Sequence, residues 1–276
     1  MRSIMAEKKL CFIGAGNMTR SIATGLVNNG YPASLIHATN PSAPKLAGLQ
    51  KSLNIATSHD NLAAAKQADV IVLSVKPHFM QEVCEQLSTL DLSKKLIITI
   101  AAGIPAKRYG DYFGQEIKLI RTMPNTPTQI GVGMTGLYAG DEISSEQKAL
   151  CEKLMLSGGE VVWVDSESEL DQVIALSGSS PAYFFLFMEA MIDNAKASGM
   201  DEEKARQLVQ QAALGAAQMV KQNPELTTAQ LRANVTSKGG TTAQAVAALE
   251  AGNLRGIVKQ AMDDCVARAQ EMAKQY

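Results

Sequence analysis

Short apolar runs alternate with longer amphipathic segments over the first part of the chain. The runs that predict buried strands of a parallel sheet are Leu10–Ile13, Leu35–Ala38, Val70–Val75 and Leu96–Ala101, with shorter candidates at 55–57, 118–121, 134–138 and 161–164. The segments with helical periodicity between them are 18–28, 45–53, 61–66, 80–87 and 145–156. This alternation predicts a doubly wound, mostly parallel α/β sheet.

The pattern changes after Asp165–Ser168, where the chain becomes rich in Ala, Gln, Met and Leu and shows no strand-like run. Ser180 and Pro181 predict the capped start of a helix that Gly199 ends. Further helices are expected at 202–222, 228–234, 242–250 and 254–274. We therefore predict an α/β domain over residues 1–164 and an all-helical domain over residues 165–276.

The helices of the second half are apolar on most faces. Small residues dominate them, and Phe184, Phe185 and Phe187 are half of the six phenylalanines in the chain. A helix that is apolar all round must be buried, and a layer of about a hundred residues has little interior of its own. The pattern favours association of subunits, with packing inside one chain as the alternative.

Composition narrows the classes of protein. Of the 276 residues, 26 are Lys or Arg and 27 are Asp or Glu, so nucleic-acid binding lacks its usual electrostatic support. No uninterrupted apolar run approaches the roughly 20 residues of a membrane span, and Met1–Met5 lacks the apolar region of a signal peptide. We expect a cytoplasmic protein with neither a membrane nor a nucleic-acid partner.

Cysteine and histidine spacing gives no sign of a metal site. Four cysteines (Cys11, Cys84, Cys151 and Cys265) and three histidines are scattered without Cys-x-x-Cys or His-x-x-x-His spacing. We interpret the cysteines as small core residues in a reducing compartment and predict no metal ligands.

A glycine-rich turn follows the first predicted strand in the run Phe12–Ile13–Gly14–Ala15–Gly16–Asn17–Met18. Gly14 allows a tight turn, Gly16 allows a pyrophosphate to approach the backbone, and the helix starting near Asn17 directs N–H groups at that anion. Thr19 departs from the dinucleotide fingerprint, which has Gly or Ala there, but it is also small. The turn predicts a dinucleotide site.

The second predicted strand ends without a carboxylate, in His37–Ala38–Thr39–Asn40–Pro41–Ser42, and Lys45 follows. An acidic residue there would bind the ribose 2′-hydroxyl of NAD, whereas Asn, Ser and Lys accept a 2′-phosphate. NADPH is therefore favoured, with NADH as the weaker alternative, although a polar turn can also be only a turn.

Two other strand ends, Val75–Lys76–Pro77 and Ala101–Ala102–Gly103, are expected to border the nicotinamide half of the cofactor. In the helical half, two clusters rich in Ser, Thr and Gly precede predicted helices, at 176–183 and 235–242. Their N–H groups and hydroxyls suit a small carboxylate. Thr241 and Gln244 match a capping box, which would leave Thr242 free for substrate; a capping role for the whole second cluster is the alternative.

Six ordered motifs together resemble the pyrroline-5-carboxylate reductase family over essentially the whole chain. They are Phe12–Met18, Val75–Pro77, Ala101–Gly103, Arg121-x-Met123–Pro124–Asn125–Thr126–Pro127, Ser177–Tyr183 and Ser237-x-Gly239–Gly240–Thr241–Thr242. The resemblance implies an N-terminal Rossmann domain and a helical dimerisation domain, in a homodimer that often assembles into a decamer. Lys238 departs from the family, whose members commonly have Pro there.

The resemblance also implies roles for individual residues. The loop with Ser237, Gly239, Gly240, Thr241 and Thr242 would bind substrate near the nicotinamide held by a partner subunit, with Thr242 hydrogen-bonded to the ring nitrogen. Positions that would contact the cofactor, together with the glycine-rich turn, are Gly14, Ala15, Gly16, Asn17, Met18, Asn40, Asn61, Ser74, Val75, Lys76, Pro77, Ala102 and Gly103.

The implied reaction is the reduction of 1-pyrroline-5-carboxylate to L-proline, the last step of proline biosynthesis, by hydride transfer from NADPH to the imine carbon. Because an imine nitrogen protonates more readily than a ketone oxygen, a hydroxyl donor such as Thr242 suffices.

Two alternative functions remain open. A β-hydroxyacid dehydrogenase would need Lys196, about four turns from Pro181, as its catalytic lysine, and a non-catalytic NADPH-binding sensor would need no substrate loop.

Overall fold

The computed structural model describes residues 8–275, which form two compact units. The first unit runs to Ser179 and takes up the chain again from Cys265, and the second is Ser180–Asp264. The sequence analysis predicted a domain boundary after residue 164, because no strand-like apolar run follows it. The units divide later because the segment that follows residue 164 packs on the sheet: a Cβ on Gly136 of the sheet would lie 2.6 Å from Val173 Cγ1.

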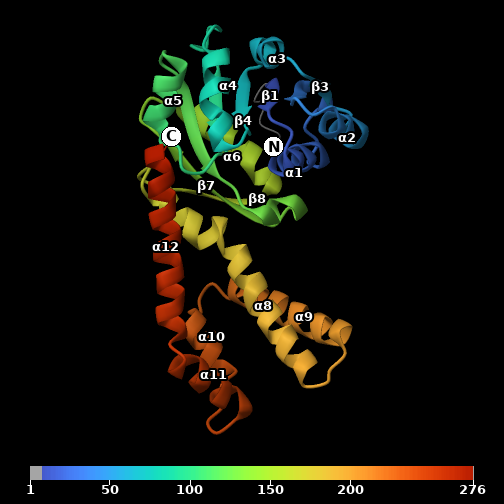
Figure 1. Cartoon of the computed structure of the whole chain (residues 1–276), viewed down its shortest axis with the longest axis vertical. Coiled ribbons are helices and arrows are strands. Elements are labelled where there is room, and N and C mark those ends of the chain that lie inside the picture. The colour runs from blue at the N-terminus through green and yellow to red at the C-terminus, as the bar shows by residue number, and fades with distance from the viewer. Residues whose placement is uncertain (1–7, 276) are drawn as a thin grey trace. The chain divides into compact units, whose positions relative to one another are not determined.

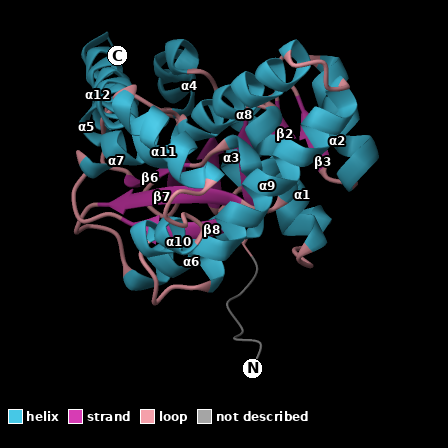
Figure 2. Cartoon of the chain, turned by 90° about the horizontal axis from the view of Figure 1, so that it is seen from below, coloured by secondary structure: helices cyan, strands magenta, loops and turns pink. Residues whose placement is uncertain are grey.

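The first unit is built on an eight-stranded sheet with the order β3-β2-β1-β4-β5-β6-β7-β8. The strands are β1 (Leu10–Ile13), β2 (Ile36–Thr39), β3 (Ala56–Ser58), β4 (Val70–Leu73), β5 (Leu96–Thr99), β6 (Lys118–Met123), β7 (Gly133–Ala139) and β8 (Gly159–Trp163). Neighbouring strands in this described sheet are parallel except β6 and β7, which lie side by side with β8 in Figure 2. The predicted doubly wound, mostly parallel sheet is confirmed.

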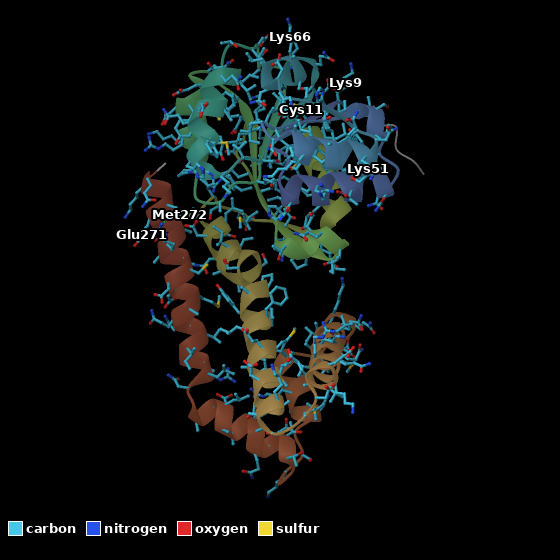
Figure 3. The ribbon with its side chains drawn as sticks, turned by 45° about the vertical axis from the view of Figure 1, so that its right-hand side comes forward. Lys9, Cys11, Lys51, Lys66, Glu271 and Met272 are labelled. Atoms are coloured by element: carbon cyan, nitrogen blue, oxygen red, sulfur yellow. The ribbon has the colours of Figure 1, made fainter. Side chains whose placement is uncertain are left out.

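Two layers of helices cover this sheet (Figure 1). They are α1 (Asn17–Asn28), α2 (Ala43–Leu53), α3 (Asn61–Gln67), α4 (Met80–Leu87), α5 (Ala106–Phe113), α6 (Ser145–Met155) and the short α7 (Glu169–Val173). Alternation along β1 explains the layers: Leu10 and Phe12 join a core with residues of α1, α2 and α6, whereas Cys11 (Figure 3) and Ile13 join a core with α3, α4 and α5.

The second unit contains α8 (Ser180–Ala197), α9 (Glu202–Gln222), α10 (Thr228–Asn234), α11 (Thr241–Ala251) and the first part of α12 (Leu254–Gln275). The predicted all-helical character is confirmed. Gly199, with φ of +89°, ends α8 as expected, and its N–H donates to the carbonyl oxygen of Lys196 at 2.9 Å. Ser180 is the first helical residue of α8 rather than its cap, because the chain enters α8 from a π-helical turn, Ile174–Gly178.

α7, the π turn and α8 form one helix from Glu169 to Ala197. Among the described residues it is the one helix long and apolar enough to cross a membrane by length and composition alone. Its phenylalanines at 184, 185 and 187 are between 48% and 64% exposed in the single chain. An apolar helix surface of this kind is equally suited to an interface between subunits.

Candidate functional site

Gly14 makes the tight turn between β1 and α1 at the carboxyl edge of the sheet. Its φ is +111°, and its N–H donates to the carbonyl oxygen of Thr39 at 2.9 Å. A Cβ at this position would lie 2.5 Å from the carbonyl oxygen of Ser74, at the end of β4. Both the backbone conformation and the close approach therefore require glycine.

Thr19 secures this turn from inside. The side chain is fully buried, and its Oγ1 donates to the carbonyl oxygen of Gly14 at 2.7 Å. The sequence analysis treated Thr19 as a tolerated departure from the dinucleotide fingerprint. In the structure the Thr19 hydroxyl stabilises the turn, because an alanine or glycine at 19 would leave the Gly14 carbonyl oxygen without this donor.

The N-terminus of α1 has the features of an anion-binding site. Gly16 occupies the N-cap position with no side-chain cap, and the first turn holds no acidic residue. A Cβ on Gly16 would meet nothing within 4 Å, so open space lies beside this backbone. The uncapped N–H groups and the positive end of the helix dipole are what a pyrophosphate binds.

Ser74 provides an independent sign of a ligand at the same edge. Its Oγ is buried and has no hydrogen-bond partner within the described part of the chain. An unsatisfied buried hydroxyl costs free energy, so such a group calls for a partner, and a bound ligand at this edge would supply one. With Gly14 and Gly16, it makes an edge whose donor groups fit a dinucleotide.

Asn40 shapes the turn after β2. Its Oδ1 accepts from the Ser42 N–H at 2.9 Å, and its carbonyl oxygen is 2.8 Å from Nδ1 of His59. Residues 36–45 include no acidic side chain, so nothing in this turn repels a 2′-phosphate.

Replacing Asn40 with Asp is expected to reverse the cofactor preference. Asp keeps an acceptor for the Ser42 N–H but adds a negative charge, so we expect the KM for NADPH to rise about 10- to 100-fold while that for NADH does not. Asn40→Ser is the control, because it keeps an oxygen acceptor without charge. Steady-state kinetics with both cofactors measure the effect, and an unchanged preference in Asn40→Asp would remove Asn40 from the cofactor site.

Asn61 is the first residue of α3, and both ends of its side chain are engaged. Its Oδ1 accepts from Thr39 Oγ1 at 2.6 Å and its Nδ2 donates to Gln86 Oε1 at 3.0 Å. Asn61 thus links the end of β2 to α4. Thr39, which the sequence analysis did not single out, is the buried member of this link.

The two other strand ends differ in character. Lys76 is exposed and precedes a short 3₁₀ helix, Pro77–Phe79, while Val75 and Pro77 are half-buried. Gly103 has φ of +76°, and a Cβ there would lie 2.9 Å from Cβ of Met272 on α12 (Figure 3). Close packing against α12 therefore accounts for the glycine at 103, beside the half-buried Ala102.

A partly buried ion pair that the sequence gave no reason to expect lies at the end of β6. Arg121 Nη1 is 2.6 Å from Glu167 Oε1, which also accepts from the Ala106 N–H at 2.6 Å. Burial raises the pKa of the nearby Asp171, against the opposing influence of the Arg121 charge and a hydrogen bond from Gln270. These charges tie α7 and the end of α12 to the sheet.

The candidate substrate loop lies in the second unit, whereas every candidate cofactor residue lies in the first. Gly239 has φ of +76°, and the Gly240 N–H donates to Ser237 O at 3.0 Å, which closes a tight turn. Thr241 and Thr242 follow as the first exposed residues of α11.

The predicted capping box at Thr241 is wrong. Gly240 takes the N-cap position, no side chain caps this helix, and the Gln244 N–H donates to the Gly240 carbonyl oxygen at 3.3 Å. The turn between Ser237 and Gly240 starts the helix one residue earlier than expected. Neither threonine hydroxyl is consumed in capping, so both Thr241 and Thr242 can donate to a ligand.

Lys196 does not fit the role of a catalytic acid. Its Nζ is 2.8 Å from Glu202 Oε2, and this hydrogen bond and charge raise its pKa. Cys11, Cys84 and Cys151 are buried, which confirms them as core residues, and burial raises the pKa of the Cys11 and Cys84 thiols to about 12. Cys265 is only partly buried, so the interpretation as a core residue is wrong there. No group of three or more potential metal ligands occurs in residues 8–275.

Two family models match the chain, one on each half. Residues 9–103 match the family described as NADP oxidoreductase, coenzyme F420-dependent, and residues 167–272 match the family described as pyrroline-5-carboxylate reductase dimerisation. Together with the dinucleotide-type turn, these matches define a two-domain, NADP-dependent oxidoreductase with a helical dimerisation domain.

Full-length relatives narrow the class. The chain is 53% identical over 272 residues to a pyrroline-5-carboxylate reductase of Vibrio alginolyticus, covering 99% of this chain and 100% of the relative. The solved pyrroline-5-carboxylate reductase of Coxiella burnetii is 42% identical with a TM-score of 0.90, covering 97% and 99% of the two chains. That of Plasmodium falciparum, with NADP bound, is 29% identical with a TM-score of 0.87, covering 98% and 99%. The chain belongs to the pyrroline-5-carboxylate reductase family.

Proposed function

We propose that this chain reduces 1-pyrroline-5-carboxylate to L-proline, the last step of proline biosynthesis, with NADPH as the hydride donor. The observation that carries the proposal is the 53% identity over the full length of a relative of that name. The buried Ser74 hydroxyl, which has no partner among residues 8–275, and the uncapped start of α1 support a bound dinucleotide independently of the comparison.

When bound, NADPH supplies a hydride for the imine carbon. The residues of the chain that we assign to its binding are those of the turn from Gly14 to Met18, with Asn40, Asn61 and the strand ends Ser74–Pro77 and Ala102–Gly103. Thr39 and Gln86 hold the Asn61 amide in one orientation. Orientation of two bound reactants contributes up to roughly 7–11 kcal/mol to a lowered barrier in favourable cases.

Substrate is assigned to the loop Ser237–Thr242 of a second copy of the chain. Backbone N–H groups at the start of α11, which has no side-chain cap, suit the substrate carboxylate. The Thr242 hydroxyl donates a hydrogen bond to the ring nitrogen. Because an imine nitrogen is basic, this donor replaces the buried acid that reduction of a ketone would need.

Thr242→Ala is expected to lower kcat about 10- to 100-fold with the fold intact, which corresponds to one lost hydrogen bond of about 1.5–3 kcal/mol to a charged group. Turnover of pyrroline-5-carboxylate is followed by NADPH absorbance. Thr228→Ala is the matched control, because Thr228 is also an exposed threonine in the first turn of a helix in the same unit. Wild-type turnover in Thr242→Ala would remove this hydroxyl from the mechanism.

The same assay separates the proposal from the two other activities. A hydroxyacid dehydrogenase would oxidise NADPH with β-keto acids and not with pyrroline-5-carboxylate, and a sensor would oxidise it with neither. The ion pair of Lys196 with Glu202 weighs against the dehydrogenase.

The dimerisation domain supports a homo-oligomer. We further propose that dimers assemble into a decamer in the cytoplasm, with no nucleic-acid or membrane partner. The exposed phenylalanines of α8 would then be covered by another copy of the chain. Light scattering at the exit of a sizing column measures the mass, and a dimer mass at assay concentration would contradict the decamer.

A further inference from the structure

Asn125 lies two residues after the end of β6 and joins three segments of the first unit. The residue is 8% exposed, its Oδ1 accepts from the Met134 N–H at 2.9 Å, and its Nδ2 donates to the Ser177 carbonyl oxygen at 3.0 Å. A backbone N–H can meet only the oxygen of the amide and a carbonyl only its nitrogen, so the orientation of the side chain is fixed. Neither Asp nor Leu can make both bonds in this way.

The Ser177 carbonyl has a particular need for an outside donor. Four residues further on stands Pro181, which has no N–H, so the bond that an α-helix would form to the Ser177 carbonyl oxygen is missing. The helix from Glu169 to Ala197 contains its π turn at this place, with the Ser179 N–H donating to Ile174 O at 2.7 Å. Asn125 supplies the donor that Pro181 removes.

This bond lies where the chain passes from one unit to the other. Ser179 is the last residue of the first unit before Ser180, and Cys265 is the first residue on the return. The Cys265 thiol donates to Ser179 Oγ at 3.4 Å, so the two crossings of the chain are bonded to each other. Gly178 also packs closely against the end of β6, because a Cβ there would lie 2.8 Å from Met123 Cε.

We propose that Asn125 is a positioning residue for the reduction: it holds the π turn and thereby fixes the course of the chain into the helical unit that carries the Ser237–Thr242 loop. Asn125 itself contacts neither substrate nor cofactor in this proposal. The inference rests on the proposed function for its kinetic readout, and the bonds that carry it are independent of that function.

The test uses one variant that breaks the bond and a second that makes the bond unnecessary. Asn125→Asp keeps an acceptor for the Met134 N–H but has no donor for Ser177. We expect its kcat to fall by about tenfold, with NADPH affinity, measured by fluorescence titration, within about twofold of wild type. Adding Pro181→Ala restores a helical N–H for the Ser177 carbonyl, and the double variant should recover to within about threefold of Pro181→Ala alone.

Thr122→Val is the matched control for a general loss of stability, because it removes another buried hydrogen bond at the end of β6, from Thr122 Oγ1 to Thr99 O, without touching the helix. Its kcat should stay near that of wild type. Wild-type kcat in Asn125→Asp, or a double variant no better than Asn125→Asp, would overturn the proposal.

A separate measurement distinguishes this failure from failure of the proposed function. If the wild-type protein does not reduce pyrroline-5-carboxylate, the function is wrong, but amide hydrogen exchange over residues 174–183 still tests the positioning. Asn125→Asp should exchange faster there than wild type, and adding Pro181→Ala should slow the exchange again. Equal exchange in wild type and Asn125→Asp would show that Asn125 does not hold the turn.

Discussion

Replacing Gly14 with alanine is expected to lower kcat/KM for NADPH at least about 100-fold and to destabilise the sheet unit. Alanine at φ of +111° carries a strain of about 1–2 kcal/mol. Its Cβ would also lie 2.5 Å from the Ser74 carbonyl oxygen, a backbone atom at the end of a fully buried strand. The turn must open to relieve this contact, which displaces the Ser74 hydroxyl and the N–H groups that we assign to pyrophosphate binding.

Gly16→Ala is the matched control for this prediction. Gly16 has an ordinary extended conformation, with φ of −79°, and a Cβ there meets nothing within 4 Å. We expect the thermal midpoint of this variant to stay near that of wild type while the KM for NADPH rises, because the new methyl group occupies the open space that we assign to the cofactor. Equal thermal midpoints for the two variants would show that the contact with Ser74 does not constrain the turn.

Glu167→Ala is expected to lower the free energy of unfolding by about 2–4 kcal/mol. Breaking a buried ion pair by removing one partner costs about 3–5 kcal/mol, because the remaining charge is left uncompensated. The Arg121 side chain is 9% exposed but that of Glu167 is 32% exposed, so solvent reduces the effect. Loss of the acceptor for the Ala106 N–H adds to it. Urea denaturation at fixed protein concentration measures the change.

Asp263→Asn provides the comparison for an exposed ion pair. Lys259 and Asp263 are paired on α12 with side chains 76% and 55% exposed, so no measurable change in stability is expected. Glu167→Gln should fall between the two, because its amide oxygen can still accept both hydrogen bonds but carries no negative charge. An effect of Glu167→Ala as small as that of Asp263→Asn would mean that the Arg121 charge is solvated after all.

Features set by neighbouring residues were predictable. The strands β1, β4 and β5 were found because a strand buried on both faces is a continuous apolar run, and the Gly14 turn because few residues other than glycine adopt its conformation. The start of α11 was missed by one residue, because Thr241 has the sequence of a cap while the turn from Ser237 to Gly240 decides where the helix begins.

The amino-acid sequence by itself determined the succession of the strands and of most helices along the chain, the dinucleotide turn and, through its resemblance to a family, the expected reaction. Only the tertiary structure decided that Thr19 bonds the turn, that the buried Ser74 hydroxyl has no partner among residues 8–275, that Glu167 pairs with Arg121 and that Asn125 donates to the π turn. The last two bonds join residues 46 and 52 positions apart. Periodicity and backbone preference act over a few neighbouring residues, whereas the partner of a buried polar group is set by which segments the folded chain brings together.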